Sequence, residues 1–182
     1  MTKKIILLGI TGGIAAYKSA DIASKLVRQD FLVDVVMTDA ATRFITPLTL
    51  KTITHRNVHV SQWADYEPKP DHISLASRCD IAVIAPATAN TIAKIAHGIA
   101  DNLLTSTLLA LKAPLLVAPA MNSFMWKNPI TQQNIQVLRD RNIEIIEPAT
   151  GRLACGTEGT GRMADTDEIL AVIQRKILSN HE

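Results

Sequence analysis

Short apolar runs alternate along the chain with segments in which apolar and polar residues recur at helical spacing. Five apolar runs predict strands, at residues 4–10, 32–37, 81–85, 115–118 and 143–147. Helical patterns fall between or after these runs, at residues 14–29, 92–97, 101–112, 129–141 and 167–178. Strands that alternate with helices predict an α/β fold, a three-layer, mostly parallel, Rossmann-like (flavodoxin-like) sheet with helices on both faces.

Three stretches interrupt this alternation. Residues 38–54 contain Pro47 and predict two short helical pieces. Residues 55–71 predict a long loop, a feature that in compact domains is commonly functional or mobile. Residues 154–163 form a glycine-punctuated loop. With 182 residues and no internal repeat or linker, the chain is expected to form one domain over residues 1–182.

Composition narrows the function classes. The hydrophobic content of 47% and charged content of 20% indicate a globular chain. A net charge of +2 and an aromatic content of 4% argue against a nucleic-acid partner. The N-terminal apolar run is too short for a signal peptide, and no stretch approaches the length of a membrane helix. We therefore expect a cytoplasmic protein with no membrane partner.

Two segments carry the strongest sign of function. Residues 119–126, Pro-Ala-Met-Asn-Ser-Phe-Met-Trp, directly follow a predicted buried strand and would place an amide, two thioethers and an indole at the mouth of the sheet. The loop 154–163 carries Cys155, one of only two cysteines. Loops that leave the carboxyl ends of parallel strands are where open α/β sheets bind ligands. Together these segments predict a small-molecule site.

Two strand ends offer donors for an anion. The first strand is followed by a G-x-x-G-G turn ending at Gly13, which is neither a P-loop nor a G-x-G-x-x-G fingerprint. Taken alone, this turn is a phosphate-binding candidate for which we favour a plain tight turn. Residues 88–91 follow the third strand and have ordinary capping chemistry, which also suits a phosphate. A dinucleotide would use Asp39 for its ribose, but we favour Asp39 as a helix cap. Both mononucleotides and dinucleotides remain compatible with these loops.

Two side chains, His72 and Cys155, are candidates for reactivity. His72 falls at a predicted junction of loop and helix, where an imidazole could act as a general base or be an ordinary structural residue. Cys155 has Arg152 and Arg162 nearby in sequence, a plausible setting for a reactive thiol. Cys79 is expected to be a small buried hydrophobic residue. Neither the cysteines nor the histidines show metal-ligand spacing.

The segments at residues 71–76, 119–126 and 154–163 resemble motifs of the homo-oligomeric flavin-containing cysteine decarboxylases, most closely the members that act in coenzyme A biosynthesis. The resemblance covers essentially the whole chain. It implies an FMN-dependent enzyme that converts 4′-phosphopantothenoylcysteine to 4′-phosphopantetheine. The expected route is flavin oxidation of the substrate to a thioaldehyde, loss of CO₂ and re-reduction, because direct decarboxylation would leave a carbanion without an electron sink.

The same resemblance implies roles for matching residues. His72 would act as base, Asn122 would hold the substrate carboxylate, and Cys155 would donate a proton. FMN contacts are implied for Gly12, Gly13, Ile14, Thr38, Thr88, Ala89, Asn90, Thr91 and Ala120. Substrate contacts are implied for Asn122, Met125, Arg152, Ala154 and Met163, the last three on a flap over residues 149–165.

The resemblance also implies partners. Its members build their sites between subunits of trimers that can assemble into dodecamers, so Asp101 and Asn102 would approach a neighbour's flavin. The chain ends at Glu182, which fits a stand-alone decarboxylase with a separate phosphopantothenoylcysteine synthetase. The alternatives are a flavin prenyltransferase, a peptidyl-cysteine decarboxylase and a non-enzymatic regulatory flavoprotein. Residues 119–126 and Cys155 argue against the first, and the lack of a long acidic tail argues against the last.

Overall fold

The computed structural model describes residues 3–63, 71–152, 154 and 156–179. Its centre is a six-stranded sheet in the order β3-β2-β1-β4-β5-β6, with parallel pairing between neighbours. The strands are β1 (Ile5–Ile10), β2 (Leu32–Met37), β3 (Val58–His59), β4 (Ile81–Ala87), β5 (Leu115–Pro119) and β6 (Glu144–Ile145). The prediction of a parallel α/β sheet is therefore confirmed.

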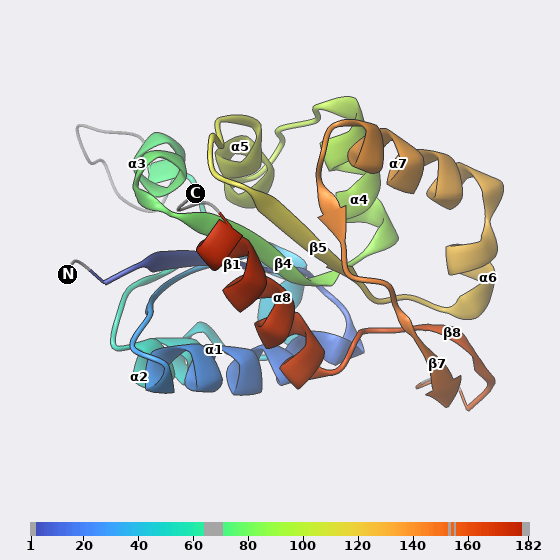
Figure 1. Cartoon of the computed structure of the whole chain (residues 1–182), viewed down its shortest axis with the longest axis horizontal. Helices are drawn as coiled ribbons and strands as arrows, with labels where there is room; N and C mark the ends of the chain where they lie inside the picture. Colours follow the sequence, from blue (N-terminus) through green and yellow to red (C-terminus); the bar gives the residue numbers. More distant parts are fainter. Residues whose placement is uncertain (1–2, 64–70, 153, 155, 180–182) are drawn as a thin grey trace.

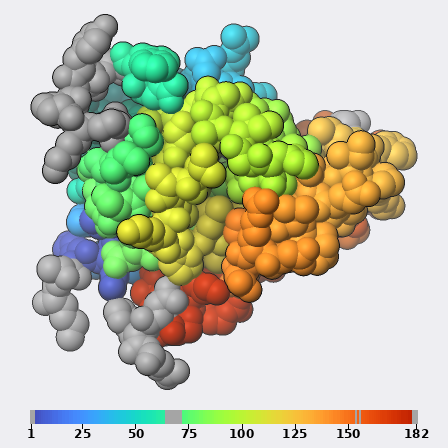
Figure 2. Space-filling view, turned by 90° about the horizontal axis from the view of Figure 1, so that it is seen from above, coloured from blue at the N-terminus to red at the C-terminus, as the bar shows by residue number. Residues whose placement is uncertain are grey.

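Helices cover both faces of this sheet (Figure 1). One layer contains α1 (Lys18–Arg28), α2 (Pro47–Thr54) and α8 (Thr166–Ser179). The opposite layer, seen from above in Figure 2, contains α3 (Asp71–Arg78), α4 (Ala89–His97), α5 (Leu103–Leu109) and α7 (Pro129–Asp140). Each layer has its own hydrophobic core, since Ile6 and Leu8 of β1 pack toward α1 and α8 whereas Leu7 packs toward α3 and α5. Burial on both faces explains why the strands are continuous apolar runs.

A charged residue, Asp34, is buried between the sheet and the layer that contains α3 and α5. Asp34 of β2 is 2% exposed and accepts hydrogen bonds from Arg56 Nε at 2.6 Å and Arg78 Nε at 2.7 Å. A buried carboxylate is tolerated only when it is paired in this way. Because Arg78 is the last residue of α3, the pair fixes that end of the helix against the sheet.

Short elements account for the differences from the sequence prediction. The 3₁₀ helix η1 (Ile14–Tyr17) begins the expected helix at residues 14–29, and η2 (Asp39–Arg43) with α2 gives the two expected helical pieces. Within regions expected to be loops lie β3 and an antiparallel hairpin of β7 (Ala149–Arg152) and β8 (Glu158–Arg162). These strands are too short or too rich in glycine and threonine to show an apolar alternation. In the described part of the chain no helix is long and apolar enough to cross a membrane.

Candidate functional site

A cavity of about 710 Å³ lies beyond the carboxyl ends of β1, β4 and β5. Its walls come from four parts of the chain: residues 12–15, 17 and 18 after β1, 88–89 after β4, 120–122 and 125 after β5, and 152, 154 and 161–163 in the hairpin region. The segments that the sequence singled out thus share one cavity. Its volume falls in the range of small-molecule and cofactor sites, roughly 300–1,000 Å³.

The turn after β1 depends on a missing side chain. A Cβ at Gly12 would lie 2.4 Å from Cβ of Ala40 and 2.8 Å from that residue's carbonyl carbon, so only glycine fits. Gly13 is extended, and a Cβ there would lie 3.8 Å from Cγ2 of Thr88, an ordinary contact. The hydroxyl of Thr11, 1% exposed, donates to the carbonyl of Pro86 at 2.7 Å. The turn is therefore fixed against both neighbouring strand ends while its backbone faces the cavity.

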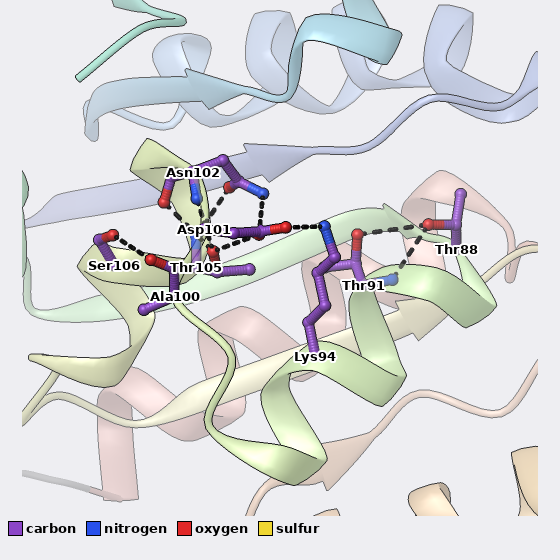
Figure 3. Close-up of polar contacts among 8 residues, drawn as sticks. All are labelled: Thr88, Thr91, Lys94, Ala100, Asp101, Asn102, Thr105 and Ser106. Carbon is purple, nitrogen blue, oxygen red and sulfur yellow. Dashed lines mark hydrogen bonds and ion pairs between the residues drawn. The ribbon is translucent and has the colours of Figure 1, made fainter. Parts of the chain in front are cut away.

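The wall after β4 is the capped start of α4. Thr88 Oγ1 accepts a hydrogen bond from the backbone N–H of Thr91 at 3.4 Å and donates to Thr91 Oγ1 at 3.3 Å (Figure 3). Thr88 and Ala89 line the cavity. Asn90 is exposed and Thr91 is buried, and neither contributes to the lining. Capping therefore accounts for part of the expected anion loop.

The connection from α4 to α5 is fixed by a polar network (Figure 3). Lys94 Nζ donates to Asp101 Oδ2 at 2.6 Å, and this hydrogen bond holds the pKa of Asp101 below its ordinary value. Asn102 and Thr105 form a reciprocal capping box at the start of α5. Asp101 and Asn102 do not line the cavity of their own chain.

Residues after β5 divide between the cavity and the core. Asn122 caps α6 (Ser123–Lys127), its Oδ1 accepting from the N–H of Phe124 at 2.8 Å. This cap fixes the orientation of the Asn122 side chain beside Met121 and Met125 on the cavity wall. Trp126, expected at the mouth of the sheet, is instead 8% exposed and packs in the core. In the short helix α6 Phe124 and Met125 are exposed while Trp126 turns toward the core, which explains this correction.

The hairpin closes the fourth wall. The backbone N–H of Met121 donates to the carbonyl of Gly161 at 2.9 Å, which joins β8 to the segment after β5. Gly161 has φ of +142°, and a Cβ there would lie 2.3 Å from the carbonyl oxygen of Met121. Arg152, Ala154 and Met163 line the cavity as expected for flap residues. Cys155 lies outside the described residues.

Besides Asn90 and Thr91, two further expected site residues, Thr38 and His72, do not line this cavity. Thr38 caps η2, its hydroxyl accepting from the N–H of Ala41 at 3.3 Å. Thr38, and not Asp39 as expected, is therefore the cap, and Asp39 is the first residue of that helix. His72 is half-buried near the start of α3 and is not part of the lining. A single chain therefore does not bring His72 to Asn122.

The positive charge of the cavity wall was not predicted from the sequence. Lys18, Arg152 and Arg162 line it, and the described lining residues include no carboxylate. The other lining residues without a contact role predicted from the sequence are Ala15, Tyr17, Met121 and Gly161. Lys18 could have been found, because it lies four residues after Ile14 and so falls on the same helical face. Arg162 was noted only as a neighbour of the thiol.

The remaining titratable candidates are structural. Burial raises the pKa of the Cys79 thiol to about 11, and the side chain packs in the core as expected. His97 Nε2 lies 3.0 Å from Asn134 Oδ1 at the end of α4, which Gly98 closes in a left-handed conformation. Among the described residues no group of three or more His, Cys, Asp or Glu could hold a metal ion.

Known proteins are similar to this sequence over nearly its whole length. A curated relative from Streptococcus mutans, described as a probable phosphopantothenoylcysteine decarboxylase, is 45% identical over 180 residues, 97% of this chain and 100% of the relative. The coenzyme A biosynthesis bifunctional protein CoaBC of Bacillus subtilis is 41% identical over 176 residues, 96% of this chain and 43% of that protein. The chain therefore spans less than half of the bifunctional protein.

Solved structures agree with the fold. A PPC decarboxylase mutant complexed with pantothenoylaminoethenethiol has a TM-score of 0.85 at 35% identity, over 95% of this chain and 97% of that chain. The FMN binding protein AtHal3 gives 0.82 at 35% identity, over 95% and 96%. The family model described as Flavoprotein matches residues 1–178. With nearly the whole chain matched, this protein belongs to the Flavoprotein family.

Proposed function

We propose that this chain is an FMN-dependent decarboxylase that converts 4′-phosphopantothenoylcysteine to 4′-phosphopantetheine in coenzyme A biosynthesis. The observation that carries the proposal is the shared cavity, in which the glycine turn, the Asn122 segment and the hairpin face one another. The names of the Streptococcus mutans relative and of the PPC decarboxylase structure support the same reaction. They favour it over the prenyltransferase and regulatory alternatives.

The described residues suit FMN. The glycine turn brings backbone close to the cavity, and Thr88 with Ala89 adds the start of α4, so uncharged donors for a phosphate are supplied from two strand ends. Three cations and no described carboxylate on the walls favour an anionic cofactor. We assign Gly12, Gly13, Ile14, Thr88, Ala89 and Ala120 to its contacts. When bound, FMN would supply reversible hydride transfer with no net redox change.

Asn122 would orient the substrate carboxylate, with Met125 beside it. The cap on Phe124 holds the amide in place before substrate arrives, which lowers the entropy lost on binding. An uncharged amide can donate to a carboxylate without attracting a proton from it, whereas an acidic side chain would repel the same group. Arg152, Ala154 and Met163 would contact substrate from the hairpin side.

His72 would serve a neighbouring subunit. It lies outside the cavity of its own chain, yet the proposed reaction needs a base near the substrate thiol. A homotrimer with sites between subunits would satisfy both facts, with Asp101 and Asn102 also facing the neighbour. We further propose that four such trimers can assemble into a dodecamer. Cys155 would protonate the product from the flap.

The test is the reaction of the purified protein. We expect a yellow protein whose chromophore, released on denaturation, is FMN and not FAD. It should release CO₂ from 4′-phosphopantothenoylcysteine and yield 4′-phosphopantetheine by mass spectrometry. A C-terminal cysteine peptide and dimethylallyl phosphate test the peptidyl-cysteine and prenyltransferase alternatives, and turnover of either in place of the proposed substrate would refute the assignment.

Place and pathway follow from the same proposal. The substrate would be supplied by a phosphopantothenoylcysteine synthetase in the cytoplasm. In the CoaBC relatives, by their description, one bifunctional protein serves coenzyme A biosynthesis. Growth of a strain that lacks this gene should therefore be restored by the product of the reaction but not by its substrate.

A further inference from the structure

Two cations on the cavity wall, Lys18 and Arg162, have not yet been assigned to a contact with a particular group of the cofactor or substrate. Lys18 lies at the start of α1 and Arg162 at the end of β8, far apart in the sequence. Both line the cavity, and both face the carboxylate of Asp165, which directly precedes α8. We propose that Lys18 and Arg162 bind the terminal phosphate of the substrate, an inference that rests on the proposed function.

The ion pairs at this point are loose. Lys18 Nζ lies 3.7 Å from Asp165 Oδ1, and Arg162 Nη2 lies 3.2 and 3.3 Å from the two carboxylate oxygens. Charge-assisted N–H···O bonds are commonly about 2.7–2.9 Å long. Elsewhere in the same layer Lys25 meets Asp167 at 2.7 Å and Asp21 at 2.9 Å. The two cavity cations are therefore held near each other without being closely neutralised.

Donor capacity exceeds what Asp165 can use. A lysine ammonium has three N–H donors and an arginine guanidinium has five. One carboxylate at these distances leaves the pair with a net positive charge and with donors for another anion. A phosphate dianion accepts several such bonds. The side chain of Lys18 is 19% exposed, so its charge is screened by solvent less than that of a surface lysine.

The site needs a second place for phosphate. FMN and the proposed substrate each carry a phosphate group, and the substrate adds a carboxylate. The glycine turn and the start of α4 offer uncharged donors for the cofactor, and Asn122 is assigned to the carboxylate. Arg152 is paired in register with Glu158 across the hairpin, so a carboxylate already lies opposite it. Lys18 and Arg162 remain for the substrate phosphate.

This arrangement would make the enzyme selective for phosphorylated compounds. The pair joins α1 to the hairpin, so a bound phosphate would also hold β8 against the body of the protein. A dephosphorylated analogue would find the same amide and the same cofactor but would leave both cations unused. Discrimination should therefore depend on these two side chains and not on the reacting end of the substrate.

The experiment compares ligands that differ only in phosphate. Calorimetric titration of the FMN-loaded protein with 4′-phosphopantetheine and with pantetheine gives the ratio of their dissociation constants. We expect the phosphorylated compound to bind at least tenfold more tightly. K18Q and R162Q should each lower that ratio roughly tenfold to a hundredfold, the range for hydrogen bonds to charged groups, and leave pantetheine binding unchanged. K18R should largely preserve the ratio.

A matched control is R175Q, which removes an arginine from an ion pair with Glu144 on the far part of α8 and should leave the ratio unchanged. If wild type binds both compounds equally, or if K18Q and R162Q weaken both equally, the subsite is wrong although decarboxylation stands. Loss of FMN by these variants, measured by fluorescence after denaturation, would also overturn it. If wild type decarboxylates neither substrate form but still prefers the phosphorylated product, the subsite stands and the proposed function fails.

Discussion

The hydroxyl of Thr11 accepts a hydrogen bond from the backbone N–H of Thr88 at 3.0 Å while donating to the carbonyl of Pro86. One buried side chain therefore connects the turn after β1 with the start of α4, the two walls assigned to the cofactor phosphate. Neither wall has another described side chain that joins it to the other through both a donor and an acceptor. The separation of these walls is set by Thr11.

Replacing Thr11 with valine should test this role. The T11V side chain has nearly the same shape but removes the acceptor of the Thr88 N–H, at a cost of about 1–3 kcal/mol for an unsatisfied buried group. The carbonyl of Pro86 loses the hydroxyl but keeps its hydrogen bond from the backbone N–H of residue 11 at 3.3 Å. Urea unfolding should detect the loss, and the purified variant should retain less FMN. T52V removes a hydroxyl bonded within α2 on the surface and is the control. Equal destabilisation of the two variants would contradict the prediction.

Adjacent glycines should respond differently to alanine. G12A would force a Cβ to 2.4 Å from Ala40, and relief of such overpacking typically costs about 1–3 kcal/mol. G13A meets only an ordinary contact with Thr88 and keeps an extended backbone that alanine adopts. Thermal unfolding of the two cofactor-free variants should show a lower midpoint for G12A alone. A similar loss in G13A would mean that the turn is constrained by more than this contact.

A substitution at Asn122 should separate its role as a helix cap from its proposed role in substrate binding. Aspartate caps a helix about as well as asparagine, so N122D should keep α6 and the free energy of unfolding. Its charge would repel the substrate carboxylate, so KM should rise by at least tenfold, while the FMN content stays at the wild-type level. Steady-state kinetics with unfolding curves measure both effects. An unchanged KM would remove Asn122 from substrate binding.

Mixing two inactive variants should restore activity if His72 serves a neighbour. In H72N no site has its base, and in N122D no site has its amide, so each protein alone should be nearly inactive at substrate concentrations far below the raised KM of N122D. In randomly mixed oligomers about a quarter of the sites would combine an intact histidine from one chain with an intact asparagine from the next. Co-expression followed by a CO₂ assay measures this fraction. A mixture as inactive as its parents would place both residues in one chain's site.

Cys79 predicts a decline in stability at high pH. Burial raises its pKa to about 11, so the folded state favours the neutral thiol, whereas the unfolded thiol ionises near 8.5. The stabilisation is complete below the unfolded value and is lost as the pH rises toward the folded value. Unfolding free energies of wild type and C79A should therefore converge between about pH 8.5 and pH 11. A difference that stays constant over this interval would contradict the assignment.

Strands and long helices could be predicted because burial on two faces leaves an uninterrupted pattern. The β1 run and the glycine turn after it were both evident in the sequence, and so was the position of the Asn122 segment behind β5. The order of the strands in the sheet was not evident, because parallel strands are joined by helices and the neighbours of each strand are determined by packing. The sequence also could not show that Trp126 turns into the core, since five residues of α6 give too little periodicity.

The cavity charge was hidden for a different reason. Lys18 and Arg162 are ordinary members of a helix and a strand, and only folding brings them to Asp165. The hairpin was hidden because glycine and threonine carry its backbone hydrogen bonds without an apolar face. His72 was singled out by its neighbours in sequence, but its distance from the cavity of its own chain could only be seen in three dimensions.

The order of the cavity walls along the chain also bears on biosynthesis. Gly12 contributes to the first wall and Met163 to the last, so the pocket is incomplete until almost the entire polypeptide has left the ribosome. Riboflavin phosphate cannot be enclosed by a nascent N-terminal portion. Truncation by a late stop codon before β8 would thus remove the last wall of the compartment that retains the prosthetic group, and would also remove α8 from one face of the central sheet.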